Sequence, residues 1–171
     1  IVTRHLKDTM PDVFRSFARV SAIAPGVLGL TGVETGEVVL GLCEKIRPDA
    51  IIAIDSLVSR KLSRLCRTIQ LSDTGITPGG GIAPGRFPLD EQTLHTPVLA
   101  LGIPTVVEAR TLAADLCPNA PPEEELPPTS LIVTPKDIDA LMVKSAKILG
   151  YAIDMALHTH LSVEDIESLL S

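Results

Sequence analysis

The hydrophobic positions of this chain form short continuous runs that alternate with longer stretches of helical periodicity. Residues 51–54 are all apolar and are followed by Asp55, a pattern typical of a strand buried on both faces of a parallel sheet. We therefore expect Asp55 to lie at the carboxyl end of that strand. Other short apolar runs predict strands at residues 19–24, 68–71, 97–101 and 131–134.

Segments of helical periodicity separate these runs. Between residues 34 and 47 the apolar side chains recur on one face, which predicts an amphipathic helix joining strands 19–24 and 51–54 in a β–α–β unit. Pro104 suits the first turn of another helix, because its missing N–H costs nothing there. The remaining periodic segments predict helices at residues 59–66, 105–116, 135–157 and 162–170.

Together these elements predict an α/β fold, a three-layer arrangement in which a mostly parallel sheet is flanked by helices. A length of 171 residues suits a single domain, residues 1–171, with a sizeable core. The first residues of the sequence resemble the end of a helix or the middle of a strand, so we expect N-terminal elements of the fold to precede them. Residues 117–130 are rich in Pro and Glu without hydrophobic periodicity, and we expect a mobile excursion there.

Composition and charge indicate which kinds of partner this protein can bind. A net charge of −6 without a basic stripe argues against nucleic acid. No apolar run is long enough for a membrane helix and no signal peptide is recognisable, so no membrane is expected. Three widely spaced cysteines fit reduced thiols and a cytoplasmic protein. Charged residues make up only 21%, which favours an apolar interface and a homo-oligomer.

The leading candidate for chemistry is Asp55, because ligands of open α/β sheets bind beyond the carboxyl ends of the strands. An apolar strand beneath a carboxyl group removes it from water and suits it to acid/base catalysis. An acid at this position can equally cap the turn that follows the strand, so both interpretations stay open.

A second acid, Asp73, opens the run Asp73-Thr74-Gly75 and leads into a glycine-rich loop that ends near Arg86. The run matches the motif of pepsin-like proteases, but those are all-β, and an Asx-turn at Asp73 is the favoured alternative. The loop lacks both the P-loop ending and the dinucleotide fingerprint, so it fits a peptide-binding or hinge loop better than a nucleotide site. The candidate supporting residues are Asp73 and Thr74, and the candidate substrate contacts are Gly75, Gly79 and Gly80.

Glu34 is a further candidate supporting acid. Its position at a helix start is better explained by a favourable interaction with the helix dipole, and a role as a site acid is the alternative. The histidines lack the spacing of a zincin, no serine lies in a nucleophile elbow, and each cysteine is better explained as a small buried hydrophobe. Carboxylates therefore remain the best candidates for catalysis.

Several runs of this sequence together carry a family resemblance. They include Val2–Leu6, Pro25–Gly29, Thr31–Thr35, Ile52–Leu57, Thr68–Ile76, Gly102–Val107 and Val133–Asp139. The combination resembles the germination protease family, spore endopeptidases that degrade small acid-soluble spore proteins. The Pro/Glu-rich segment after Cys117 is shorter than the insert that the family carries there.

The resemblance implies an α/β fold like that of the hydrogenase-maturation proteases, a tetrameric enzyme of the spore interior, and synthesis as an inactive zymogen. It also implies two catalytic aspartates, one of which matches Asp55. The other belongs to a Thr-Pro-Asp-Ala-Leu-Gly-Pro segment upstream of the matched runs, before Ile1. We therefore expect the present chain alone to be inactive unless other residues supply the second acid.

The implied mechanism is endopeptidase hydrolysis in which one carboxylate activates water and its protonated partner assists at the scissile bond. No cofactor is certain. A divalent metal is an alternative, because paired acids also bind divalent ions and the related maturation proteases engage nickel. Two other functions stay open: a non-proteolytic relative with an incomplete site, and a metal-dependent maturation-type protease.

Overall fold

The computed structural model describes residues 8–81 and 85–170, so the matched run Val2–Leu6 and part of the glycine-rich loop lie outside it. The chain divides into two compact units. One extends from Pro25 to Ile138, and the other combines residues 1–24 with residues 139–171. Each unit has its own helices, and the sheet belongs to the first.

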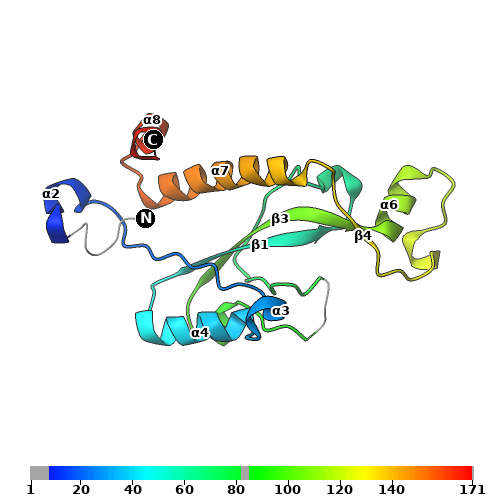
Figure 1. Cartoon of the computed structure of the whole chain (residues 1–171), viewed down its shortest axis with the longest axis horizontal. Coiled ribbons are helices and arrows are strands. Elements are labelled where there is room, and N and C mark those ends of the chain that lie inside the picture. The colour runs from blue at the N-terminus through cyan, green and yellow to red at the C-terminus, as the bar shows by residue number, and fades with distance from the viewer. Residues whose placement is uncertain (1–7, 82–84, 171) are drawn as a thin grey trace. The chain divides into compact units, whose positions relative to one another are not determined.

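The Pro25–Ile138 unit is an α/β structure built on a mixed sheet (Figure 1). Its central strand β3 (Val98–Glu108) pairs in parallel with β1 (Ile51–Ser59) and antiparallel with β2 (Gln70–Ser72) and β4 (Ile132–Val133). The prediction of a mostly parallel sheet is therefore wrong. Only residues 60–69 connect β1 to β2, fewer than the roughly dozen residues that a crossover to a parallel strand needs, so β2 runs antiparallel to β1 and to β3, which lies between them.

Helix α4 (Thr35–Ile46) confirms the helix predicted at residues 34–47. Its side chains Val39 and Leu40 pack against a core cluster that includes Ala53 of β1 and Val98 of β3. This packing covers one face of the sheet near the start of both strands. The other helices of the unit are α3 (Leu28–Thr31), η1 (Leu62–Arg64), α5 (Glu91–Leu94), α6 (Ala109–Leu116) and η2 (Glu123–Glu125).

The strand predicted at residues 19–24 is absent, so that prediction and the β–α–β unit built on it are wrong. A strand needs a neighbouring chain to satisfy its backbone N–H and C=O groups. Residues 19–24 belong to the other unit, and Ile23 is 56% exposed. The apolar pattern alone could not reveal this missing neighbour.

Strands β1 and β3 both extend beyond their predicted ends. Because β1 continues to Ser59, the helix predicted at residues 59–66 is reduced to η1. Because β3 continues to Glu108, α6 begins at Ala109 and not at Thr105. Pro104 therefore lies inside a strand, where the register between β1 and β3 shifts. A missing N–H is tolerated at such an irregularity.

The segment predicted as a Pro/Glu-rich excursion contains η2 and is bonded to α6. The Arg110 guanidinium donates to the carbonyl oxygen of Glu123 at 2.7 Å, and the Thr111 hydroxyl donates to the Glu123 carboxylate at 3.1 Å. These two hydrogen bonds attach one turn of the segment to α6 of the Pro25–Ile138 unit.

The second unit contains α2 (Pro11–Phe14), α7 (Ile138–Leu157) and α8 (Val163–Leu170), which confirms the helices predicted at residues 135–157 and 162–170. Ser162 and Asp165 cap α8 reciprocally: each side chain accepts a hydrogen bond from the other residue's backbone N–H, at 3.1 and 2.9 Å. The ring of His158 lies 4.7 Å from that of Phe17 and is buried.

Candidate functional site

Asp55 lies in the middle of β1, four residues before the strand ends at Ser59. The prediction that Asp55 terminates the strand is therefore wrong. The apolar run stops at Asp55, but the backbone ladder with β3 continues beyond it. The side chain is half-buried, and its carboxylate oxygen Oδ1 accepts a hydrogen bond from the Ser56 N–H at 2.8 Å. This bond orients the carboxylate and leaves Oδ2 for other partners.

The alternation of the strand places Asp55 on the sheet face that carries the core. Ala53, Asp55 and Leu57 point to one face, whereas Ile52 and Ile54 point to the other. Ala53 is buried under α4, and Leu57 borders a cavity. Asp55 therefore lies between the closed core and an accessible hollow, with apolar side chains on both sides along its strand.

Directly beside Asp55 on β3 lies Gly102. A Cβ atom added at Gly102 would collide with the side chain of Leu57, so Leu57 leans across β3 at this point. The absence of a side chain at Gly102 therefore lets an apolar side chain cover the sheet next to the carboxylate.

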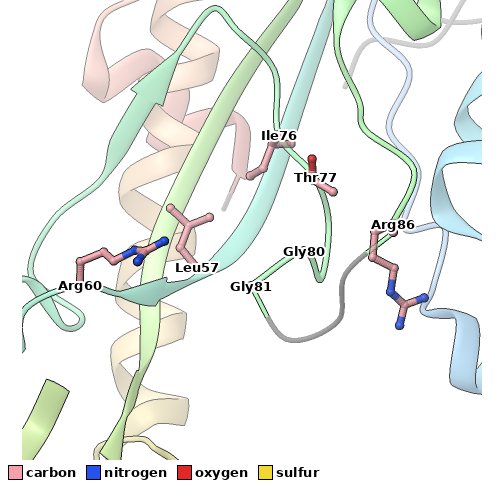
Figure 2. Close-up of a pocket in the computed structure, with 8 residues that line it drawn as sticks. Leu57, Arg60, Ile76, Thr77, Gly80, Gly81 and Arg86 are labelled. Atoms are coloured by element: carbon pink, nitrogen blue, oxygen red, sulfur yellow. The ribbon is translucent and has the colours of Figure 1, made fainter. Parts of the chain in front are cut away.

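The glycine-rich loop closes onto this face of the structure. Ile76 and Leu89 exchange two backbone hydrogen bonds, of 3.0 and 2.8 Å, which bring the two ends of the loop together. Between this loop and β1 lies a cavity of about 430 Å³ (Figure 2). Its lining residues are Leu57, Arg60, Ile76, Thr77, Gly80, Gly81, Gly85 and Arg86.

The three glycines predicted to contact substrate have different positions. Gly80 lines the cavity, and its N–H donates to the Thr77 carbonyl at 3.0 Å. Gly79 has a φ of +69°, and a Cβ added there would lie 3.8 Å from the Arg86 Nε, whereas Gly75 has a φ of +83° and packs against the backbone of Leu89. The positive φ of Gly79 and Gly75 thus favours glycine at both positions through the backbone conformation itself. Contact with substrate stays a prediction for all three.

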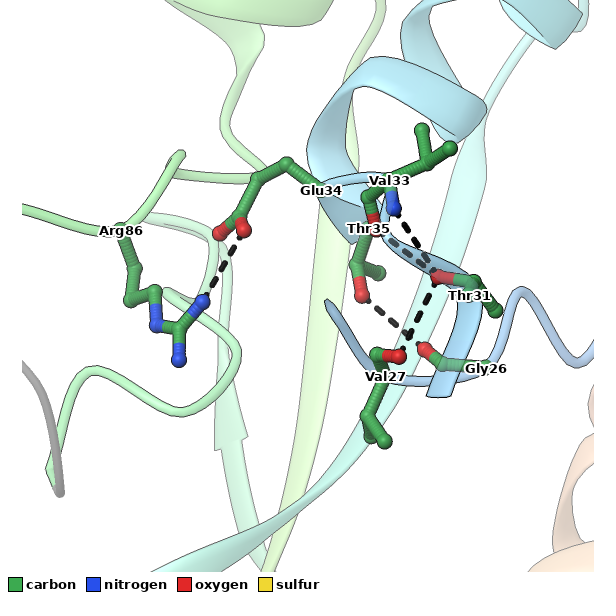
Figure 3. Close-up of polar contacts among 7 residues, drawn as sticks. All are labelled: Gly26, Val27, Thr31, Val33, Glu34, Thr35 and Arg86. Carbon is green, nitrogen blue, oxygen red and sulfur yellow. Dashed lines mark hydrogen bonds and ion pairs between the residues drawn. The ribbon is translucent and has the colours of Figure 1, made fainter. Parts of the chain in front are cut away.

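Glu34 forms an ion pair with Arg86, with 3.0 Å between the Glu34 Oε2 and the Arg86 Nη1 (Figure 3). Glu34 is the N-cap residue of α4, but its side chain makes no capping bond. The ion pair joins the start of α4 to the end of the glycine-rich loop. Arg86 was not a predicted site residue, and a separation of 52 residues leaves no local sequence signal for the pair.

Asp73 is exposed and borders a different cavity, of about 280 Å³, whose lining includes Glu91 and Pro97. The turn after β2 is made by Ser72, whose hydroxyl accepts from the Thr74 N–H at 3.1 Å and bonds to the Thr74 hydroxyl at 2.7 Å. The structure therefore brings Glu34 to the edge of the loop cavity through Arg86, but it does not bring Asp73 or Thr74 into that cavity.

Other candidate chemistries have little support in the described ranges 8–81 and 85–170. There, no group of three or more His, Cys, Asp and Glu side chains is placed to hold a metal ion. Burial raises the pKa of the Cys43 and Cys66 thiols, which disfavours the reactive thiolate. Among the same residues, no helix combines the length and the hydropathy that a membrane crossing requires.

An α/β unit with a half-buried carboxylate beside a loop-lined cavity is compatible with a hydrolase. The family model for the germination protease, a peptidase family, matches residues 1–118. Curated germination proteases from Clostridium perfringens and Clostridium tetani are 43% and 40% identical to the chain over 202 aligned positions. The chain belongs to the germination protease family.

The alignments also show how much of each relative's length this chain covers. The two clostridial alignments cover 100% of this chain and 62% of each relative. The germination protease of Halalkalibacterium halodurans is 52% identical over 116 residues, which cover 67% of this chain and 31% of that relative. Because 171 residues fill 202 positions, at least 31 positions are occupied in the clostridial relatives alone.

Proposed function

We propose that this chain forms the peptidase domain of an endopeptidase that degrades small acid-soluble spore proteins during spore germination. The observation that carries the proposal is its membership of the germination protease family, with 43% identity along the whole chain to the relative from Clostridium perfringens. The position of Asp55, half-buried beside the loop cavity, supplies a chemical group suited to this activity.

In the proposed reaction Asp55 acts as the acid/base group. Its carboxylate takes a proton from the attacking water, and a second acid, which the family resemblance implies upstream of Ile1, assists at the scissile bond. The cavity between β1 and the glycine-rich loop accepts an extended peptide, with Leu57 and Ile76 as apolar contacts. Backbone groups of Gly75, Gly79 and Gly80 bind the main chain of that peptide.

The family resemblance extends the proposal to assembly and location. We expect a three-layer sheet architecture like that of the hydrogenase-maturation proteases, a homotetramer synthesised as a zymogen, and action in the cytoplasm of the spore. The composition agrees with an oligomer, because charged residues make up only 21% of the chain.

The decisive test uses the protein expressed from its complete reading frame, with an acid-soluble spore protein as substrate. Asp55→Asn is close to isosteric and keeps the oxygen that accepts the Ser56 N–H, so the fold should survive. We expect this variant to lose cleavage. Asp49→Asn makes the same chemical change at an exposed position just before β1 and should cleave at the wild-type rate.

Each alternative function predicts a different result in that assay. A non-proteolytic relative would leave the substrate intact even in the wild-type form. A metal-dependent protease would lose its activity on exhaustive chelation and regain it when a divalent ion is added. Full activity of Asp55→Asn would exclude the role proposed for this carboxylate.

A further inference from the structure

A second polar side chain lies level with Asp55 on the same face of the sheet. Gly102 of β3 pairs with Asp55 of β1 on one side and with Gln70 of β2 on the other. Residues that pair directly across neighbouring strands point to the same face of a sheet. Asp55, Gly102 and Gln70 therefore form one row across the sheet, and the central residue has no side chain.

The spacing of this row suits a bound peptide. Adjacent strands lie about 4.8 Å apart, so the Cα atoms of Asp55 and Gln70 are about 10 Å apart. Leu57 leans over Gly102 and forms an apolar floor between them. Leu57 also lines the cavity below the glycine-rich loop, so the floor continues into that cavity. A peptide that lies on this floor has a carboxylate on one side and a carboxamide on the other.

The two side chains have complementary hydrogen-bonding abilities. An ionised Asp55 only accepts, whereas the carboxamide of Gln70 can donate through its NH₂ group. Gln70 is exposed, so its amide is available to a ligand. A neutral donor beside a bound peptide is suited to the carbonyl oxygen, where negative charge develops during hydrolysis.

We propose that Gln70 is a catalytic residue of this site and donates a hydrogen bond to the carbonyl oxygen of the peptide bond that Asp55 attacks through water. This inference rests on the proposed function. The water oxygen bonds to the carbonyl carbon while Asp55 takes one of its protons, and the C=O π electrons move onto the oxygen held by Gln70. When the C=O bond re-forms, the C–N bond breaks and the leaving nitrogen takes that proton from Asp55.

The test compares Gln70→Glu and Gln70→Leu with wild type in the protein expressed from its complete reading frame, with an acid-soluble spore protein as substrate. Glu has nearly the shape of Gln but, when ionised, donates no hydrogen bond. We expect both variants to lose about a hundredfold in kcat, the scale seen when one oxyanion donor is removed, with little change in KM or Tm. Gln92→Glu, on the exposed surface of α5, is the matched control and should retain wild-type kcat.

The possible outcomes distinguish a failure of the role proposed for Gln70 from a failure of the proposed endopeptidase function. If Asp55→Asn is inactive while Gln70→Glu keeps wild-type kcat, the role of Gln70 is refuted and the proposed function stands. If Asp55→Asn is active, the proposed site itself fails. If Gln70→Leu alone loses activity, and does so with a lowered Tm, the role of Gln70 is structural. Residues that act on one reacting bond are non-additive, so Asp55→Asn combined with Gln70→Glu should be no slower than Asp55→Asn alone.

Discussion

Gly75 offers the most quantitative test of how the candidate site is built. Its φ of +83° lies in the left-handed region, which costs a residue with a side chain about 1–2 kcal/mol. A Cβ atom there would also collide with the carbonyl oxygen of Leu89 and lie 2.7 Å from the Asp90 Cβ. The backbone of Leu89 cannot move away easily, because it forms the bridge with Ile76 that closes the loop. Gly75→Ala therefore combines backbone strain with crowding.

Overpacking of this kind adds about 1–3 kcal/mol, so the total expected loss in the free energy of unfolding is about 2–5 kcal/mol. Gly79→Ala is the matched control. Its φ is +69°, but nothing lies closer to the added Cβ than the Arg86 Nε at 3.8 Å. The control should lose only the backbone contribution, about 1–2 kcal/mol.

Urea unfolding followed by far-UV circular dichroism measures both variants, since the chain has no Trp and a single Tyr for fluorescence. The difference between Gly75→Ala and Gly79→Ala isolates the cost of crowding against Leu89. Equal losses in the two variants would refute the argument that the loop is closed by close packing at Gly75.

Two further predictions concern the described ion pair and the buried imidazole. A double-mutant cycle with Glu34→Gln and Arg86→Gln, measured by urea unfolding, should give a coupling free energy of about 0.5–1 kcal/mol, because both side chains are partly exposed. No measurable coupling would argue against the ion pair. Burial lowers the pKa of His158 in the folded chain below the ordinary value of 6.5. As the pH drops, His158 of the unfolded chain therefore binds a proton before His158 of the folded chain. The free energy of unfolding should then fall as the pH drops through 6.5 towards the pKa of the folded chain. Comparing Tm at pH 7.5 and pH 5.5 (about one unit on either side of the ordinary histidine pKa) should show a smaller fall for His158→Gln than for wild type, and equal falls would contradict this.

Local sequence patterns predicted α4, α7 and α8 well, because the signals of these helices lie within a few residues. The apolar periodicity before Pro48 located α4, and the periodicity of residues 162–170 located α8. The pairing of strands depends on residues far apart in the chain, and here prediction failed. The end of β1 is set by β3, which pairs with it beyond Asp55, and no local pattern near Asp55 contains that information.

The candidate site was predictable only in part for the same reason. Asp55 and the glycine-rich loop stand out in the sequence, because an acid after an apolar run and a cluster of glycines are local features. Arg86 and Gln70 do not stand out, since their relevance follows from an ion pair across 52 residues and from a row through Gly102. The proximity of Asp73 to the same loop in sequence was misleading, because it borders a separate cavity.

The proposed mechanism assigns the chemistry of peptide hydrolysis to the Asp55 carboxylate. The most direct measurement is the single-turnover cleavage rate of Asp55→Asn with all substrate bound to the complete enzyme. We predict a rate about 10²–10⁴-fold below wild type, the usual contribution of a general acid/base, with substrate affinity unchanged. A wild-type cleavage rate in the bound complex would show that Asp55 does not carry the reaction.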